Sequence, residues 1–198
     1  MIAGIDEVGR GCFAGPVIAG CVVFDRKMCK LEKIPVRIDD SKKLSSKRRE
    51  IADEWIRKNA KGVGIGMASV SQISRLGIKK ATEIAFRKAI KNCDVQIDYL
   101  LIDAFYIPYV KGLRRRNQKA IIHGDTKSIS IAAASIVAKV HRDKLMTELG
   151  NKAKYKKYGW GRNKGYGTKE HRNSILKYGT SRFHRKQFVR NYVSSQAQ

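Results

Sequence analysis

The chain has 198 residues, and its 42 Lys and Arg against 17 Asp and Glu give a formal net charge of +25 at pH 7. This length suits a single domain with a real core, and a hydrophobic content of 42% excludes a disordered polycation, which lacks the apolar surface to collapse. The charge predicts a polyanionic partner, because Lys and Arg release the counterions condensed on phosphates, but basic enzymes, ribosomal proteins and membrane-surface proteins all share it.

The first half of the chain predicts three strands and one helix. A turn containing Gly9, Gly11 and Gly15 separates the first two strands, in which β-branched residues are frequent. Ser45 or Ser46 is suited to cap the helix. In order, we expect strands at 2–6 and 17–24, a helix from the capping serine to about 59 and a strand at 63–68.

The second half predicts further alternation of helices and strands. Ser71 or Ser74 is expected to open a helix, and the first half of the segment 128–149 is apolar nearly all round, which indicates a helix buried in the core. The expected elements are a helix to about 92, strands at 99–102 and 120–122, helices at 128–149 and 168–178, a loop at 150–167 and a basic tail. This order predicts an α/β fold with a mixed central sheet flanked by helices. We expect a core at 1–150 and a basic C-terminal helical segment at 151–198 packed on it.

The few acids are informative by their positions. Asp6 and Glu7 end the first expected strand, Asp103 ends the central one, and Asp125 precedes the apolar helix. Ionised carboxylates at the edge of apolar elements need a cation or a hydrogen-bond donor. If the first and central strands are neighbours, Asp6 and Asp103 meet beyond the strand ends, where active sites of α/β sheets commonly lie.

A group of three or four carboxylates is a hard oxygen ligand set of the kind that Mg²⁺ or Mn²⁺ prefers. Two such ions activate water and stabilise the leaving oxygen in phosphodiester hydrolysis. Taken singly, Asp103 as the start of a turn and Asp125 as a helix cap are ordinary structural residues. The pair of Asp6 and Glu7 beside Gly9-Arg10-Gly11 is more specific, because two glycines allow close approach of the backbone and an arginine offers a forked cation for phosphate.

Targeting signals and cysteine pairs give no competing assignment. Residues 1–6 contain no basic segment leading into an apolar one, so no signal peptide is expected. No run approaches the roughly 20 apolar residues that span a bilayer. Cys12, Cys21, Cys29 and Cys93 form none of the close pairs of a zinc site. We therefore expect a cytoplasmic protein with free thiols, with no coiled-coil pattern to demand a dimer.

Six blocks, in order along nearly the whole chain, resemble the motifs of the ribonuclease HII family. They are Ile5-Asp6-Glu7-Val8-Gly9-Arg10-Gly11 with Ala14-Gly15-Pro16-Val17, Asp40-Ser41-Lys42-Lys43-Leu44, Leu101-Ile102-Asp103, Gly124-Asp125 with Ala132-Ala133-Ala134-Ser135-Ile136-Val137-Ala138-Lys139-Val140 and Arg142-Asp143, Lys164-Gly165-Tyr166-Gly167-Thr168-Lys169-Glu170-His171, and His184-Arg185 with Phe188. The chain begins at the first expected strand, so we expect no counterpart of the extra N-terminal domain of the ribonuclease HIII relatives.

The resemblance implies a ribonuclease H-like fold and an endonuclease that depends on Mg²⁺ or Mn²⁺, with two ions during catalysis. It implies cleavage 5′ to a ribonucleotide in RNA/DNA hybrids or in duplex DNA with embedded ribonucleotides, giving 3′-hydroxyl and 5′-phosphate ends, and a role in ribonucleotide removal. By motif match, the catalytic metal ligands are Asp6, Glu7, Asp103 and Asp125. The matched substrate-binding residues are Gly9, Arg10, Gly11 and Tyr166, which read the 2′-hydroxyl, and Lys42, which contacts phosphate.

Three segments depart from the family pattern. Ala104-Phe105 follow Asp103 where many bacterial members carry glycine, Asn163 stands where histidine commonly precedes the Lys-Gly-Tyr motif, and Lys156-Lys157 replace a region where proline is usual. We expect these departures to reshape loops around the substrate and to leave the chemistry intact.

Several residues favour an ordinary structural role. Tyr158 and Trp160 are expected to fasten a loop to the core, His171 and His184 to be structural or to face phosphate, and Asp143 to pair with nearby cations. The basic tail could carry a sliding-clamp motif, with Gln187 and Phe188 as fragments of one, which the sequence leaves open.

Two other functions remain open from the sequence. A noncatalytic, ribosomal-type RNA-binding protein shares the charge and predicts binding that is indifferent to metal and to changes at Asp6 or Glu7. A nuclease of similar fold acting on another nucleic-acid structure predicts cleavage that survives replacement of ribose by deoxyribose.

Overall fold

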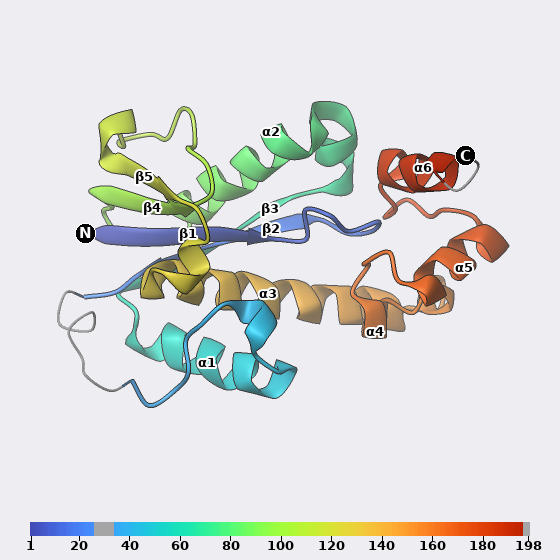
Figure 1. The fold of residues 1–198 in the computed structure, drawn as a ribbon, viewed down its shortest axis with the longest axis horizontal. Coiled ribbons are helices and arrows are strands. Elements are labelled where there is room, and N and C mark those ends of the chain that lie inside the picture. The colour runs from blue at the N-terminus through green and yellow to red at the C-terminus, as the bar shows by residue number, and fades with distance from the viewer. Residues whose placement is uncertain (26–33, 196–198) are drawn as a thin grey trace.

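The computed structural model describes residues 1–25 and 34–195, and a five-stranded mixed sheet forms its centre (Figure 1). The strands are β1 Ile2–Val8, β2 Val17–Val23, β3 Gly62–Ala68, β4 Tyr99–Asp103 and β5 Gln118–Ile121. Their order across the sheet is β3-β2-β1-β4-β5. β2 runs antiparallel to β1 and β3, whereas β1, β4 and β5 run parallel. The predicted α/β fold with a mixed sheet is confirmed.

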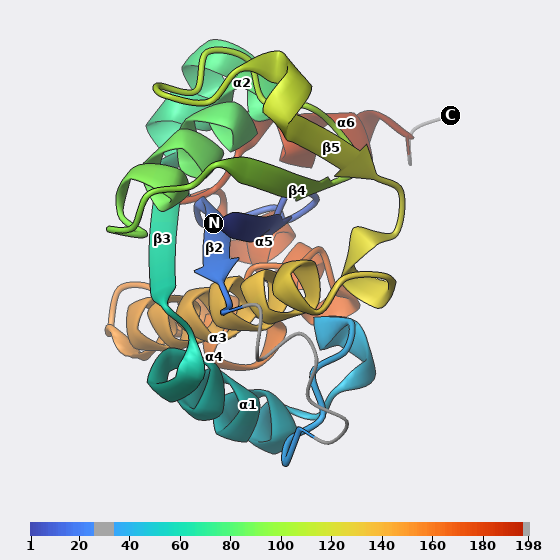
Figure 2. The same ribbon diagram turned by 90° about the vertical axis from the view of Figure 1, so that its left-hand side faces the viewer.

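Helices cover both faces of the sheet. The view along the sheet shows α2 on one face and α3, backed by α1, on the other (Figure 2). The helices of this part are α1 Ser46–Asn59, α2 Val70–Lys91 and α3 Ile129–Asn151. Short 3-10 turns, η2 Ser41–Lys43, η3 Arg115–Asn117 and η4 Gly124–Thr126, lie in the connections.

Glycines in the strands let the helices approach the sheet closely. A Cβ on Gly4 or Gly20 would lie 2.1 or 2.3 Å from backbone atoms of α3. A Cβ on Gly64 or Gly66 would lie 2.0 or 1.9 Å from carbonyl oxygens of α2. The alternation of glycine with apolar residues in β3 therefore marks a helix contact on one face of the strand.

The start of α2 differs from its prediction. Its N-cap is Ser69, whose hydroxyl accepts from Gln72 N at 3.2 Å while the Gln72 side chain accepts from Ser69 N. This capping box starts the helix earlier than Ser71 or Ser74 would. Gly77 interrupts the helix with φ 79°, a conformation open to glycine at little cost. The strand predicted at 120–122 is also shifted, because Ile122 is exposed and lies beyond β5.

The expected core helix and the serine cap of α1 are confirmed. Apolar side chains of α3 are buried between the sheet and α1 along its first half. Ser45 caps α1 and Thr168 caps the later helix α5 Lys169–Tyr178, each through its side-chain oxygen.

The C-terminal part contains more helix than its glycines and lysines predict. The loop expected at 150–167 contains η5 Lys156–Tyr158 and α4 Trp160–Asn163, and the basic tail forms α6 Lys186–Ser195. Tyr155, Tyr158 and Trp160 are buried in one cluster against Ala14 and Met146. The structural role predicted for Tyr158 and Trp160 is confirmed, and this packing positions η5 and α4. α6 packs instead through Phe188 against the core on the α2 side.

Within the described residues, Cys12, Cys21 and Cys93 are buried and free, as predicted, and Cys29 lies outside them. None of the helices in the described part of the chain combines the length and apolar character that a bilayer-spanning segment needs.

Candidate active site

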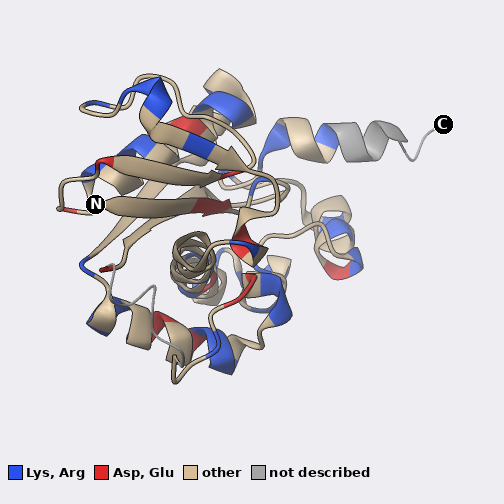
Figure 3. Ribbon diagram, turned by 60° about the vertical axis from the view of Figure 1, so that its left-hand side comes forward, with Lys and Arg blue, Asp and Glu red and all other residues tan. Residues whose placement is uncertain are grey.

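Parallel pairing of the two central strands brings the first acids together. Ile5 of β1 pairs with Ile102 of β4, and both side chains belong to the core on the α2 side. Side chains alternate along a strand, so Asp6 and Asp103, one residue further on, both point toward the α3 side. Figure 3 shows acidic positions at the ends of these strands and in the segment before α3.

The acidic pair of β1 is buried. Asp6 is only 5% exposed, and burial, followed by repulsion from Glu7 and Asp103, raises its pKa well above the ordinary value, although a hydrogen bond with Ser135 opposes the shift. Burial likewise raises the pKa of Glu7, against the opposing charge of Arg10. The folded chain therefore holds both carboxylates where their charges are unfavourable until a cation joins them.

Asp103 and Asp125 complete the group. Asp103 Oδ1 accepts a hydrogen bond from Gly124 N at 2.8 Å, which fixes η4 beside the end of β4. The buried Asp125 lies on η4. Its pKa is raised by burial, then by repulsion from Asp40 and Asp103. Interactions among the four carboxyls therefore link all the residues that the sequence nominated as metal ligands.

Asp40 is a fifth acid at this site that the sequence reasoning did not nominate. Its carboxylate caps η2 by accepting from Lys42 N at 2.9 Å, and its charge acts on Asp125. The sequence signal that could have identified Asp40 is its position directly before Ser41-Lys42-Lys43. An aspartate at such a position can cap a helical turn, and the cap then holds its carboxylate in place.

The donor chemistry suits a hard divalent cation. Carboxylate oxygens are the ligands that Mg²⁺ and Mn²⁺ prefer, and mutual repulsion here is the condition that such an ion relieves. Among residues 1–25 and 34–195, however, no three His, Cys, Asp or Glu side chains are already arranged to hold an ion.

The Gly-Arg-Gly turn presents one side to the protein and the other to open space. Gly9 has φ 88°, and a Cβ there would lie 2.2 Å from Nε of Arg142. The group that Gly9 lets approach is thus the chain's own arginine. Gly11 has no such neighbour within 4 Å. The half-exposed Arg10 lies 3.4 Å from Glu7 and its guanidinium carbon lies 5.3 Å from the ring centroid of Phe105.

Tyr166 lies beside this turn. Its side chain is 38% exposed, and it forms a hydrogen bond with the Cys12 thiol. Burial of the hydroxyl, together with Cys12, raises the pKa of Tyr166 to about 12, so the phenol stays protonated and able to donate. Lys139 Nζ and the guanidinium carbon of Arg142 lie 5.2 and 5.6 Å from the ring centroid.

Lys42 is far from Asp125 in the sequence, but in the fold its positive charge lowers the pKa of Asp125. It is exposed on η2. The structure therefore brings the predicted phosphate contact to the edge of the carboxylate group.

Two of the departures from the family pattern lie close in sequence to Asp103 and Tyr166. Ala104 has φ 67°, a left-handed conformation that explains why glycine is common at this position. Asn163 is buried, donates to Tyr158 O and accepts from Gly165 N, each at 2.8 Å. Its side chain thus shapes the loop that presents Tyr166.

The histidines are structural, as expected. His184 and His171 are buried and joined by a 3.1 Å contact between their Nε2 atoms, and Trp160 Nε1 donates to His171 Nε2 at 3.0 Å. Asp143 pairs with Lys139 at 2.9 Å and Arg49 at 3.8 Å, so its predicted pairing with cations is also confirmed.

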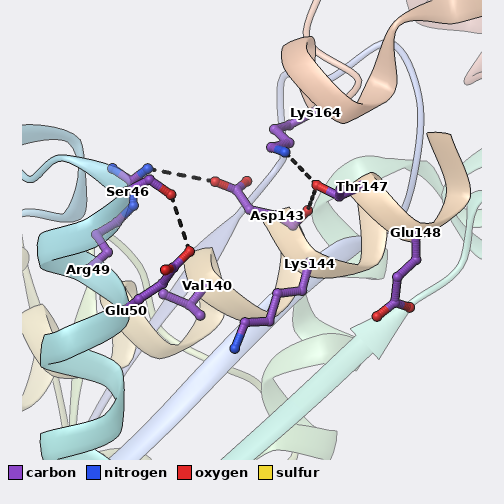
Figure 4. A pocket seen from close by; sticks show the side chains of 9 residues that line it. All are labelled: Ser46, Arg49, Glu50, Val140, Asp143, Lys144, Thr147, Glu148 and Lys164. Carbon is purple, nitrogen blue, oxygen red and sulfur yellow. Dashed lines mark hydrogen bonds and ion pairs between the residues drawn. The ribbon is translucent and has the colours of Figure 1, made fainter. Parts of the chain in front are cut away.

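A pocket of about 310 Å³ lies between α1 and α3 (Figure 4). None of the four nominated carboxylates lines it. Arg49 faces Asp143, and Lys164 donates to Thr147 and to Gly161 O. The polar groups that line the pocket therefore hold the loop before Tyr166 in place, and they are not part of the acidic site.

Comparison with known proteins gives one family. The profile of the family described as Ribonuclease HII matches residues 3–191. A Ribonuclease HII of Wolbachia pipientis subsp. Culex pipiens is 48% identical over 189 residues, which are 96% of this chain and 90% of the relative.

Solved structures agree in fold. The RNase HII in the PCNA:RNase HII complex of Archaeoglobus fulgidus has a TM-score of 0.74 at 25% identity, covering 95% of this chain and 93% of that one. Bst-RNase HIII in complex with Mn²⁺ has a TM-score of 0.66 at 19% identity, covering 95% of this chain and 64% of that one.

Proposed function

Because the chain belongs to the ribonuclease HII family and is therefore a ribonuclease H acting on RNA/DNA hybrids, we propose that it also cuts duplex DNA 5′ to an embedded ribonucleotide. The products are a 3′-hydroxyl and a 5′-phosphate, and the biological role is ribonucleotide removal during DNA replication and repair. The observation that carries the proposal is the parallel pairing that sets Asp6 beside Asp103. Arg10 pairs with the neighbouring Glu7, and the partly exposed Tyr166 lies beside the same turn.

The proposed metal ligands are Asp6, Glu7, Asp103 and Asp125, which would hold two Mg²⁺ or Mn²⁺ ions. When bound, the ions supply an activated water and stabilise the leaving oxygen. The Mn²⁺ named for the HIII structure supports this choice of metal. The raised pKa values of Asp6, Glu7 and Asp125 support it too, since a cation relieves the burial and repulsion that cause them.

The remaining side chains bind and orient the substrate. Lys42 contacts a backbone phosphate near Asp125. Gly11 leaves open space for the sugar, while Arg10 and the protonated Tyr166 hydroxyl supply donors. Recognition of the 2′-hydroxyl, the group that separates RNA from DNA, is the proposed role of this turn and Tyr166.

A clamp contact through the C-terminal segment is a further part of the proposal. The PCNA complex of the Archaeoglobus relative supports it, and the basic helix α6, where Lys186, Gln187 and Arg190 are exposed, is the candidate contact. The enzyme is proposed to act as a monomer in the cytoplasm. Gel filtration of the chain alone and mixed with a sliding clamp tests both: a clamp-free peak at twice the mass contradicts the monomer, and unchanged elution in the mixture contradicts the contact.

The deciding experiment is cleavage of a duplex that contains one ribonucleotide, with Mg²⁺ or Mn²⁺, by the wild type and by Asp103→Asn. Loss of an outer-shell partner of a metal site costs about 10–100-fold, so loss of a direct ligand is expected to lower the rate by about 100-fold or more. Asp53→Asn is the matched control, because Asp53 is a buried aspartate that pairs with Arg57 on α1 at 3.0 Å.

Equal activity of Asp103→Asn and the wild type contradicts the assignment of ligands. Cleavage of an all-deoxyribonucleotide duplex at the same rate contradicts 2′-hydroxyl recognition and favours a nuclease of another nucleic-acid structure. The ribosomal-type alternative is wrong, since membership of this family makes the chain an enzyme.

A further inference from the structure

The two proposed ribose-reading segments come from opposite ends of the chain. The turn at 9–16 follows β1, and the loop at 163–167 precedes α5. They meet through two backbone hydrogen bonds, in which Phe13 N and Ala14 N donate to Gly165 O at 2.9 and 3.1 Å. These two bonds end on a single carbonyl, so they act as a pivot, and a further contact between the segments is needed to fix the separation of Gly11 and Tyr166.

Arg142 provides this link. It lies on α3 and is completely buried. Its Nε donates to Pro16 O at 3.1 Å, one terminal nitrogen donates to Ala14 O at 3.0 Å and the other to Lys164 O at 2.9 Å. One planar guanidinium therefore binds the turn and the Tyr166 loop at the same time, from a helix buried in the core.

The same guanidinium lies between the recognising groups. It packs against the backbone of Gly9, where no Cβ fits, and lies 5.6 Å from the ring of Tyr166. Lys164 has φ 51°, and its ammonium group is itself held by Thr147 of α3. Side chains of α3 therefore hold both segments in place.

We propose that Arg142 is a positioning residue that sets the distance between the Gly-Arg-Gly turn and Tyr166 and thereby determines how strongly the enzyme prefers ribose to deoxyribose. The proposal rests on the proposed function, which assigns 2′-hydroxyl recognition to these two segments. Recognition groups must be held within about 0.5 Å to be effective. A lysine does not replace the arginine, because an ammonium group is a compact point charge without the planar fork that spreads three bonds.

Arg185 is a second, weaker link on the turn side. It donates to Gly15 O at 2.9 Å and to Arg10 O at 2.7 Å. It makes no corresponding bond to residues 163–167 among the described contacts, so it fixes the turn without setting the separation.

The test compares affinity for two duplexes, one with a single ribonucleotide and one with deoxyribose at that position. Binding is measured by fluorescence anisotropy with Mg²⁺ in an Asp103→Asn background, so that the substrate stays intact. We expect Arg142→Lys to lower the ribose preference by about 10-fold, since a misplacement of about 1 Å costs up to about 100-fold. Ile56→Val is the control, because Ile56 is buried between α1 and α3 and touches neither segment; it lowers stability and leaves the preference unchanged.

A double-mutant cycle separates positioning from general destabilisation. If Arg142 acts through Tyr166, Arg142→Lys adds little to the loss caused by Tyr166→Phe. Should Arg142→Lys fail to fold, Arg142→Gln, whose amide keeps two of the donors, is measured in its place and is expected to lower the preference by a similar factor; an unchanged preference in a folded Arg142→Gln counts equally against the proposal. An unchanged preference in a folded Arg142→Lys, or full additivity with Tyr166→Phe, overturns the proposal. Absence of any ribose preference in the Asp103→Asn background instead overturns the proposed function on which it rests.

Discussion

At the scale of single residues, the site is defined by charges that are buried before any substrate arrives. Asp6 and Asp125 are almost fully buried, and so are Arg142 and Arg185, which hold the neighbouring turn. The arginines donate to backbone carbonyls, whereas the carboxyls repel one another. The cations are therefore part of the fold, and the acids are the groups proposed to carry the chemistry.

The two buried histidines show a fixed pattern of protons. His184 Nδ1 accepts from Ser181 N at 2.8 Å, so its Nε2 carries the proton and donates to His171 Nε2. His171 then donates from Nδ1 to Tyr166 O at 2.8 Å. A second proton on His184 would face the Ser181 donor. The bond from Ser181 N is lost when Nδ1 of His184 is protonated, so this network favours neutral rings.

The preference of the two histidines for the neutral state predicts a loss of stability in acid. Burial, then His171, lowers the pKa of His184 to about 4, against about 6.5 in an unfolded chain. Between these values the unfolded chain binds more protons, so stability falls as the pH falls from about 6.5 toward 4, by at most about 3 kcal/mol. Above pH 6.5 the contribution is complete.

Thermal unfolding of the wild type and of His184→Gln between pH 7 and 4.5 measures this effect. The variant has no titrating group at this position, so its Tm is expected to decline less on acidification. Parallel declines of the two proteins would show that His184 does not titrate in this range.

At the scale of elements, helices approach the strands closely where glycine has a hydrogen atom in place of a side chain. Gly66 of β3 faces Ala85 O of α2, and an added Cβ would lie 1.9 Å from that oxygen. Overpacking of such a contact costs about 1–3 kcal/mol. We expect Gly66→Ala to lose stability by this amount in urea unfolding.

The control for this prediction is Gly161→Ala in α4. The nearest atom to its Cβ position is Asn151 Oδ1 at 3.8 Å, so the methyl group fits. The expected result is no loss, or a gain of about 0.4–1 kcal/mol from the stiffer unfolded chain. A loss at Gly161 equal to that at Gly66 would contradict the packing argument.

At the scale of the whole molecule, the charge of +25 predicts affinity for nucleic acid that falls steeply with salt. Each phosphate contact adds about 0.9 to the slope of log affinity against log salt. Lys42, whose charge reaches Asp125, is proposed to make one such contact. We therefore expect Lys42→Gln to reduce the slope by about 1.

Titrations of duplex binding at several salt concentrations give the slopes. Lys61→Gln is the matched control, because Lys61 is an exposed lysine before β3, at the end of the sheet away from Asp6, and lies 3.8 Å from Asp25. Its slope is expected to equal that of the wild type. A smaller slope for both variants would mean that the binding surface is not confined to the acidic end.

The sequence by itself determined the strands, most helices and the identities of the four acids. Alternation and apolar runs report burial of local segments, and the placement of Asp6 and Asp103 at strand ends follows from this local pattern. The motif order determined the family in the same way.

Only the tertiary structure decided which groups meet. Asp40 joins the acids, α6 forms from a basic tail, and Gly9 makes room for Arg142. These relations depend on contacts between residues that are dozens to more than a hundred positions apart in the sequence. Local periodicity carries no information about such pairs. Arg142 stands in the sequence as part of a family motif without an assigned role, and only its burial beside three carbonyl oxygens shows what it contacts.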